Sequence, residues 1–275
     1  MTDTGKSLGS WPNAPLALVV AQVRYQPSQP TDMPGLAQRF KDVAGQLFTE
    51  AQPVQQFSLV IGENGAPSSV PSIQVVGTDL RNDNGDRCLR LQEGAMTYHT
   101  SIYQGSEAFH DEWKLLLRVL CQDEPLNVVR LGLRYVDFII PLEGEVPEDY
   151  FIEDFGRSPG IWGEQAPMQL NLYEYRRDND GRLRIQYARG YGMPTLPPDL
   201  GDAAQPPGFL VRRYKSGVSG TMDMDRWRPA QGESMDEAKI GSEFTVMQAD
   251  VREAFNRIIS AKAKAVWQGQ PKEAN

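Results

Sequence analysis

The sequence has few of the side chains that most often carry out catalysis or bind metals. Its two cysteines, Cys88 and Cys121, lie far apart and form no Cys-x-x-Cys pair, and its two histidines are His99 and His110. Two widely spaced cysteines give no disulfide framework, which is typical of a reducing cytoplasm. These four scattered residues predict neither a zinc site nor a catalytic triad. We therefore expect no catalytic residues, no metal and no cofactor.

Long apolar runs and an excess of positive charge are absent as well. No apolar stretch approaches the roughly 20 residues that a membrane helix needs. The first residues, MTDTGKSLGSWPNAP, contain no apolar core of a signal peptide, so we expect a cytoplasmic protein without a membrane partner. The formal net charge of −8 is unfavourable for general nucleic-acid binding, because phosphate contacts need a basic surface.

Apolar periodicity and turn residues divide the chain into two halves with a similar order of elements. With 40% hydrophobic residues, the chain can bury a substantial core. We expect a flexible tail at 1–13, a first strand–helix–three strands–helix half at 14–125, a second such half at 126–262, and a C-terminal tail at 263–275. Within the second half, the Pro/Gly-rich segment 190–209 has no apolar period and is predicted to be a long loop.

Two short words recur at corresponding places in these halves. The strand at 19–25 ends in Val-Arg-Tyr, and the strand at 128–135 ends in Leu-Arg-Tyr. The words LRLQ at 89–92 and LRIQ at 183–186 both follow turns rich in Asp, Asn and Gly, which are typical of hairpins. The shared words and element order favour an internal repeat in which residues 19–25 superpose on 129–135.

Three helices are predicted from apolar residues that recur on one face. The segments 35–48, 107–120 and 246–259 have this pattern, and we expect their apolar faces to form the core. Thr245 and Gln248 would form a capping box at the start of the last helix. The chain is therefore predicted to be α+β. Duplicated strand–helix–strands–helix halves would form a curved antiparallel sheet packed on long helices, as in TATA-binding-protein-like or helix-grip folds.

The strand VVRLGLRYVDFII at 128–140 is unusual because charged side chains interrupt an apolar run. Alternation places Arg130, Gly132 and Arg134 on one face and Tyr135 on the other. Guanidinium groups bind carboxylate or phosphate, and a glycine between them leaves room for a ligand or partner. We predict these four residues as ligand- or partner-binding residues. The more common alternative is that the arginines pair with acidic residues of a neighbouring strand.

Acidic side chains supply a second candidate site. Asp223 and Asp225 lie two residues apart in the strand GTMDMDRW and share a face, so they could hold a divalent metal or act as acid and base. An outward polar face opposite Met222 and Met224 is the simpler interpretation, and we favour it. Asp137 is expected on the face opposite the arginines, in a pairing or capping role.

Several of these stretches resemble a known protein family. They are NAPLALVVAQVRYQP near the start, VVRLGLRYVDFIIP with its Arg-x-Gly-x-Arg-Tyr word, and a short Asp-bearing strand before a C-terminal helix. They are similar to a sporadically distributed family of bacterial proteins of similar length, although Ala17 and Gln22 depart from its pattern. The resemblance carries over no catalytic residues. The patchy distribution of the family implies an accessory role, for example in a defence or toxin–antitoxin system.

Three functions are compatible with the sequence. The acidic charge and the lack of cofactor motifs favour a non-enzymatic binding or regulatory protein whose partner is another protein. Alternatively, a small-ligand sensor would bind an anion through Arg130 and Arg134 in a cavity between sheet and helix. As a third possibility, a metal-dependent hydrolase or nuclease would use Asp223 and Asp225.

Overall fold

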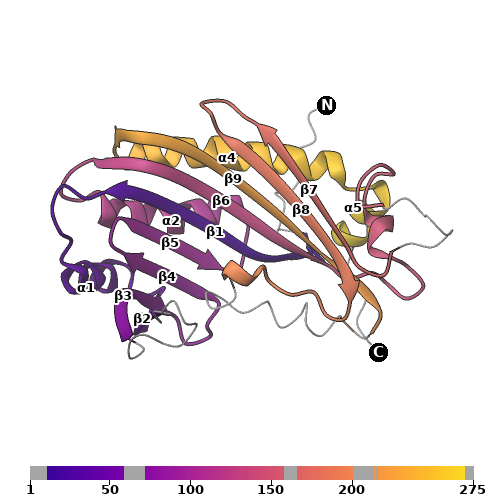
Figure 1. Cartoon of the computed structure of the whole chain (residues 1–275), viewed down its shortest axis with the longest axis horizontal. Coiled ribbons are helices and arrows are strands. Elements are labelled where there is room, and N and C mark those ends of the chain that lie inside the picture. Colours follow the sequence, from indigo (N-terminus) through magenta and orange to yellow (C-terminus); the bar gives the residue numbers. More distant parts are fainter. Residues whose placement is uncertain (1–10, 59–71, 158–165, 201–213, 215, 270–275) are drawn as a thin grey trace, which may run out of the picture.

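Alternating apolar and polar residues build a curved antiparallel sheet, which organises the molecule (Figure 1). The computed structural model describes residues 11–58, 72–157, 166–200, 214 and 216–269. In these ranges the strands are β1 (Leu16–Gln26), β2 (Glu50–Ser58), β3 (Ser72–Arg81), β4 (Arg87–Gln92), β5 (Ala95–Thr100), β6 (Leu126–Ile139), β7 (Gln169–Arg176), β8 (Arg182–Tyr191) and β9 (Val218–Met235). The helices are α1 (Met33–Ala44), α2 (Ser106–Leu120), α4 (Glu237–Ile258) and α5 (Ala261–Gln268), with short 3-10 helices η1 (Pro147–Tyr150) and η2 (Pro198–Leu200).

The strand order is β2-β3-β4-β5-β1-β6-β9-β8-β7, and all pairs are antiparallel. Each half of the chain starts with one of the two central strands, β1 or β6. The chain then crosses to an outer edge of the sheet, returns strand by strand to the centre, and enters a helix, α2 or α4. This arrangement confirms the predicted α+β class with a curved antiparallel sheet packed on helices.

Both halves differ from the predicted element order in one element. The segment predicted as the third strand after α1 is a hairpin, β4 and β5, because Gly94 turns the chain with a φ of 66°. In the second half, the helix expected after the first strand, in EDYFIEDF at 148–155, is replaced by the shorter η1, which begins one residue earlier at Pro147. The first half therefore has four strands after its first helix rather than three.

The pairing of β1 with β6 bears on the proposed repeat. Gln22 lies directly opposite Gly132. Superposing residues 19–25 on 129–135 maps Gln22 onto Gly132, so this pair would lie on the symmetry axis between the halves. The register is therefore compatible with the predicted superposition.

The second pair of repeated words does not follow the same superposition. Leu89 of LRLQ and Ala21 both pair with Tyr98 of β5, so they lie in the same row of paired residues across the sheet. The predicted equivalent of Ala21 in the second half is Leu131. Leu183 of LRIQ lies instead in the row of Leu133, two residues further along β6. The repeat stays a prediction, because its two words indicate different alignments of the halves.

The main hydrophobic core lies between the sheet and the helices, which cover one of its faces (Figure 1). Trp113 of α2 is 1% exposed and packs against Phe244 of α4, with ring centroids 4.9 Å apart. The capping box predicted at Thr245 is wrong, because α4 starts nine residues earlier. Its N-cap is Asp236, whose carboxylate accepts a hydrogen bond of 2.8 Å from the backbone N–H of Lys239.

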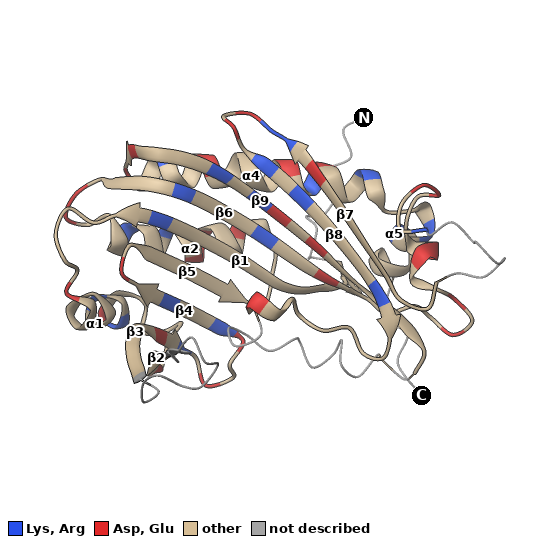
Figure 2. Cartoon of the chain, in the orientation of Figure 1, with Lys and Arg blue, Asp and Glu red and all other residues tan. Residues whose placement is uncertain are grey.

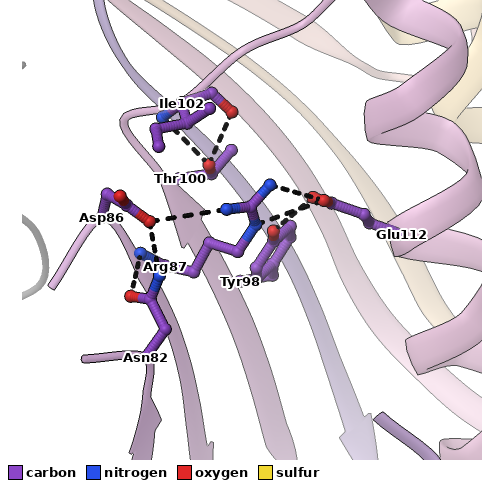
Figure 3. Close-up of polar contacts among 7 residues, drawn as sticks. All are labelled: Asn82, Asp86, Arg87, Tyr98, Thr100, Ile102 and Glu112. Carbon is purple, nitrogen blue, oxygen red and sulfur yellow. Dashed lines mark hydrogen bonds and ion pairs between the residues drawn. The ribbon is translucent and has the colours of Figure 1, made fainter. Parts of the chain in front are cut away.

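A polar network inside this layer fixes α2 to the sheet (Figure 3). Glu112 of α2 accepts hydrogen bonds from Nη2 of Arg87 at 2.8 Å and from the hydroxyl of Tyr98 at 2.6 Å. Arg87 also contacts Asp86, which accepts a hydrogen bond from Asn82. Each strong donor in this group has a partner, so the network fixes the position of the helix at little desolvation cost.

The ends of the described chain are built into the fold, contrary to the predicted tails. Trp11 is buried, and the Asn13 amide donates to the backbone carbonyls of Val266 at 3.1 Å and Gly269 at 2.8 Å. Helix α5 buries Trp267 against Tyr150, with ring centroids 5.5 Å apart. The predictions of a tail at 1–13 and 263–275 are therefore wrong for residues 11–13 and 263–269, and residues 1–10 and 270–275 lie outside the described residues. No helix in the described chain is long and apolar enough to cross a membrane.

Candidate functional site

The face of the sheet opposite α2 and α4, here called the open face, gathers charged side chains at its centre. Figure 2 shows basic positions on β4, β1, β6 and β8, and acidic positions on β9 among them. The strand register brings these side chains together because directly paired residues point to the same face. One row of paired residues crosses the middle of the face through Arg90, Thr97, Gln22, Gly132 and Trp227.

A cavity of about 340 Å³ lies on the open face. Its charged lining consists of four arginines against two aspartates, a balance of +2 in a chain of net charge −8: Arg90, Arg130, Arg134, Arg184, Asp199 and Asp225. Gly132 contributes to the cavity, and a Cβ atom added there would meet only the Cβ of Gln22, at 3.9 Å. The lack of a side chain at Gly132 therefore keeps the cavity open.

Arg134 is held by a complete set of acidic partners. Its Nε and Nη2 donate to the two carboxylate oxygens of Asp223 at 2.7 and 2.6 Å, and its Nη1 donates to Asp199 at 2.6 Å. Burial by itself would lower the pKa of Arg134, but the hydrogen bonds to Asp223 and Asp199 outweigh burial and raise it. Pairing with a neighbouring strand, the alternative considered for both arginines, is thus the arrangement observed for Arg134.

Arg130 has no such set of partners. Its nearest carboxylate oxygen, on Asp225, is 3.9 Å away, and its buried Nε has no hydrogen-bond partner among the described residues. Arg24 lies directly opposite on β1, and like charges in that position repel each other. Burial lowers the pKa of Arg130, and the nearby charges of Arg24 and Arg184 lower it further. Arg130 is therefore a half-buried cation with incomplete neutralisation.

His99 is a second unsatisfied group in the cavity, and its place was not predicted from sequence. Its side chain lies on β5 and is 4% exposed, and in the described chain neither ring nitrogen has a hydrogen-bond partner. Burial, together with the charge of Arg90, lowers the pKa of His99 to about 3. The neutral ring offers one N–H donor and one acceptor nitrogen to whatever occupies the cavity.

Asp223 and Asp225 do not form the exposed polar face that we favoured, because both are buried and contact arginines. Both side chains are buried on the open face, where Asp223 bonds to Arg134 and Asp225 lies 3.3 Å from Arg184. Burial raises the pKa of Asp225, and the arginines around it oppose that shift. In the part of the chain that the structure describes, no three His, Cys, Asp or Glu side chains are grouped so that they could hold a metal ion.

The predicted site residues separate onto the two faces of β6. Arg130, Gly132 and Arg134 line the open-face cavity, whereas Tyr135 points to the helix side, where Gln248 of α4 donates to its hydroxyl at 3.3 Å. Tyr135 is therefore not part of the arginine site. Alternation along the strand already implied this separation, and the shared Arg-x-Gly-x-Arg-Tyr word obscured it.

The predicted loop contributes a wall to the cavity. Its η2 segment places Leu200 against an apolar cluster that includes Val136 and Phe138, and it brings Asp199 onto Arg134. Residues 201–209 of the predicted loop lie outside the described residues. No protein-family model matches this chain, and no curated protein matches it. The resemblance to a bacterial family stays a prediction.

Proposed function

We propose that the protein is a non-enzymatic binding protein that takes an anionic group, a carboxylate or a phosphate, into the cavity on its open face. One observation carries this proposal. Arg130 and His99 line a cavity whose charge is positive while the whole chain is acidic, and both keep buried nitrogen atoms without a hydrogen-bond partner in the described chain. Buried polar groups without partners are costly, and the oxygens of an anion would satisfy both of these groups.

The contacts of Arg134 and Arg130 support different roles for these two arginines on the open face. Arg134 is already neutralised by Asp223 and Asp199, so it supports the cavity wall. Arg130 and Arg24 face each other, and no carboxylate of the described residues bridges them within hydrogen-bond distance, so an oxyanion between them would remove their repulsion. We therefore assign anion binding chiefly to Arg130, with Arg24 and His99 beside it.

The acidic pair supports binding rather than metal-dependent hydrolysis. Asp223 and Asp225 lie beside the guanidinium groups of Arg134, Arg130 and Arg184, which repel a divalent cation. The proposed cavity also differs from the one expected between sheet and helix, since the arginines line the opposite face of the sheet.

Thermal denaturation with inorganic phosphate or malonate tests the proposal, with chloride at equal ionic strength as the reference. An anion that binds only the folded protein raises its Tm by mass action. We expect a rise for the wild type and for Arg39→Ala, which removes a surface arginine paired with Asp123 outside the open face. We expect no rise for Arg130→Ala. Equal rises in both variants, or none in the wild type, would contradict the proposal.

A further inference from the structure

A second cavity, of about 40 Å³, lies between the sheet and α4, on the side opposite the arginines. By this kind of measure a single water needs about 10–15 Å³, so the space holds a group of roughly three heavy atoms. Aromatic and aliphatic side chains form most of its wall, among them Trp11, Tyr103, Tyr135, Met224 and Phe255. Ser106 and the exposed Arg252 also line it, so a longer molecule can leave the cavity beside them.

Asp137 of β6 lines this apolar cavity with its carboxyl group. The side chain is 3% exposed, and no hydrogen bond or ion pair joins it to another described residue. The neighbouring hydroxyls of Tyr103 and Tyr135 are both engaged by the Gln248 amide, at 3.0 and 3.3 Å. A carboxyl group so placed destabilises the fold unless something binds it, since buried charges are normally paired.

The groups around Asp137 determine what it can bind. On the helix side the ionisable groups that line the cavity are the two tyrosines and Arg252, whose guanidinium makes no ion pair with Asp137 in the described chain. From β9, Asp223 acts through the sheet from the open face. Burial, with the charge of Asp223 in addition, raises the pKa of Asp137 to about 8. No cation of the described chain thus pairs with the one carboxyl group of this cavity, although Arg252 lies at its lining.

We propose that this cavity binds the protonated head of a primary alkylamine, with the Asp137 carboxylate as its ion-pair partner. Aromatic rings line the cavity, and an ammonium group over the face of one of them would gain a cation–π attraction that an uncharged head group would not receive. The cavity size fits an ammonium group and its first carbons, and the rest of the alkyl chain leaves beside Arg252. This site is independent of the open-face cavity, because it lies on the other side of the sheet.

Proton balance gives the proposal a specific signature. Below pH 8 the carboxyl of Asp137 is mostly protonated, while the amine arrives as an ammonium ion. Pairing the two releases one proton from Asp137 to solvent, so the amine affinity rises by about tenfold per pH unit up to pH 8. Above pH 8 the carboxyl is already ionised and the affinity levels off.

Isothermal titration calorimetry with butylamine, and with butanol as its uncharged counterpart, tests the site. We expect butylamine to bind the wild type at pH 8.0 at least tenfold more tightly than butanol. At pH 6.5 butylamine should bind about 15-fold more weakly than at pH 8.0, with the release of one proton when buffers of different ionisation enthalpy are compared. Equal affinities for amine and alcohol, or no butylamine binding at pH 8.0, would overturn the proposal.

Two variants separate the carboxyl from the cavity. Asp137→Asn keeps the side-chain shape and should weaken butylamine binding at least tenfold, and Val251→Phe should block the cavity from α4 while leaving Asp137 in place. Since Arg130→Ala alters only the open face, it should keep amine binding, which makes failure of this site distinguishable from failure of the anion site. Unchanged butylamine affinity in folded Asp137→Asn or Val251→Phe would show that the amine binds elsewhere.

Discussion

Two arginine clusters on opposite faces of the sheet differ in how completely they are satisfied. On the helix side, Arg87 and Tyr98 both bond to Glu112, and this network joins α2 to the sheet. On the open face, Arg130 and His99 keep buried donors without partners in the described chain. Both clusters lie on the same sheet, and both combine arginines with partly buried acidic side chains, so burial and charge alone do not distinguish them. The unmatched donors do, and they indicate which cluster is left for a ligand.

The same difference separates two arginines that lie on the same strand. Arg134 makes a two-bond fork with Asp223, and their side chains are only 13% and 8% exposed. Arg130, four residues earlier, reaches its nearest carboxylate at 3.9 Å. We infer that Arg134 maintains the shape of the face while Arg130 contacts the ligand.

The largest expected effect comes from breaking the Arg134 fork. Arg134→Ala leaves the buried carboxylate of Asp223 without its partner, and removing one member of a buried ion pair costs about 3–5 kcal/mol. Urea denaturation measures this loss in the free energy of unfolding. The paired replacement Arg134→Met with Asp223→Leu should recover most of it. A loss below about 1 kcal/mol for Arg134→Ala would place Arg134 in the same class as Arg130.

A somewhat smaller loss is expected on the helix side. Glu112→Ala removes the common acceptor of Arg87 and Tyr98 and leaves both donors in a mostly buried place, at a cost of about 2–3 kcal/mol. Glu112→Gln keeps the shape and one acceptor oxygen, so its loss should be smaller. Denaturant midpoints of the two variants check this order, and anion binding on the open face should be unchanged in both. A change in anion binding would mean that the two clusters are coupled.

The pH dependence of stability should reveal Asp137. Its pKa in the folded protein, about 8, is far above its ordinary value of 3.8. The folded state therefore binds more protons than the unfolded state between these values, and stability falls as pH rises from about 4 to about 8, by at most about 1.4 kcal/mol per pH unit. Unfolding curves at pH 5, 6, 7 and 8 should show this decline in the wild type. Asp137→Asn should reduce it, and an identical slope in the variant would assign the decline to other groups.

The smallest effect on stability is expected for Arg130. Because Arg130 comes no closer than 3.9 Å to a carboxylate of the described chain and faces Arg24, Arg130→Ala should change the free energy of unfolding by less than about 1 kcal/mol without ligand. Comparing Arg130→Ala with Arg134→Ala by urea denaturation, without added anions, tests the contrast directly. Similar losses in both variants would indicate that the two arginines share an architectural role.

Strand alternation was enough to predict which residues share a face. It placed Arg130 and Arg134 on one side of β6 and Asp137 on the other, and it put Asp223 and Asp225 together. It could not show that β9 pairs with β6, which decides that Arg134 bonds to Asp223. Strand neighbours and their register depend on long-range packing, which a single strand's pattern does not contain.

The missed parts of the site have the same cause. His99 and Arg90 lie on β5 and β4, and only the sheet order brings them to the arginines of β6. Asp199 reaches Arg134 from a Pro/Gly-rich segment without apolar period, so no local pattern indicated it. Helix α5 was predicted as a tail because its eight residues form a weak apolar stripe, and its burial depends mainly on Trp267.

The central position of β1 affects how the chain reaches its fold over time. Gln22 pairs with Gly132, 110 positions further along, and Asn13 is held by the carbonyl of Gly269, 256 positions further along. During synthesis the apolar edge of β1 that pairs with β6 therefore stays unpaired until β6 has been synthesised. Sheets whose strands pair across such long sequence distances fold slowly and expose aggregation-prone edges until pairing is complete. This chain should therefore depend on chaperones more than a helical protein of equal length. One edge of β1, the first strand made, is thus paired only by residues that are made much later.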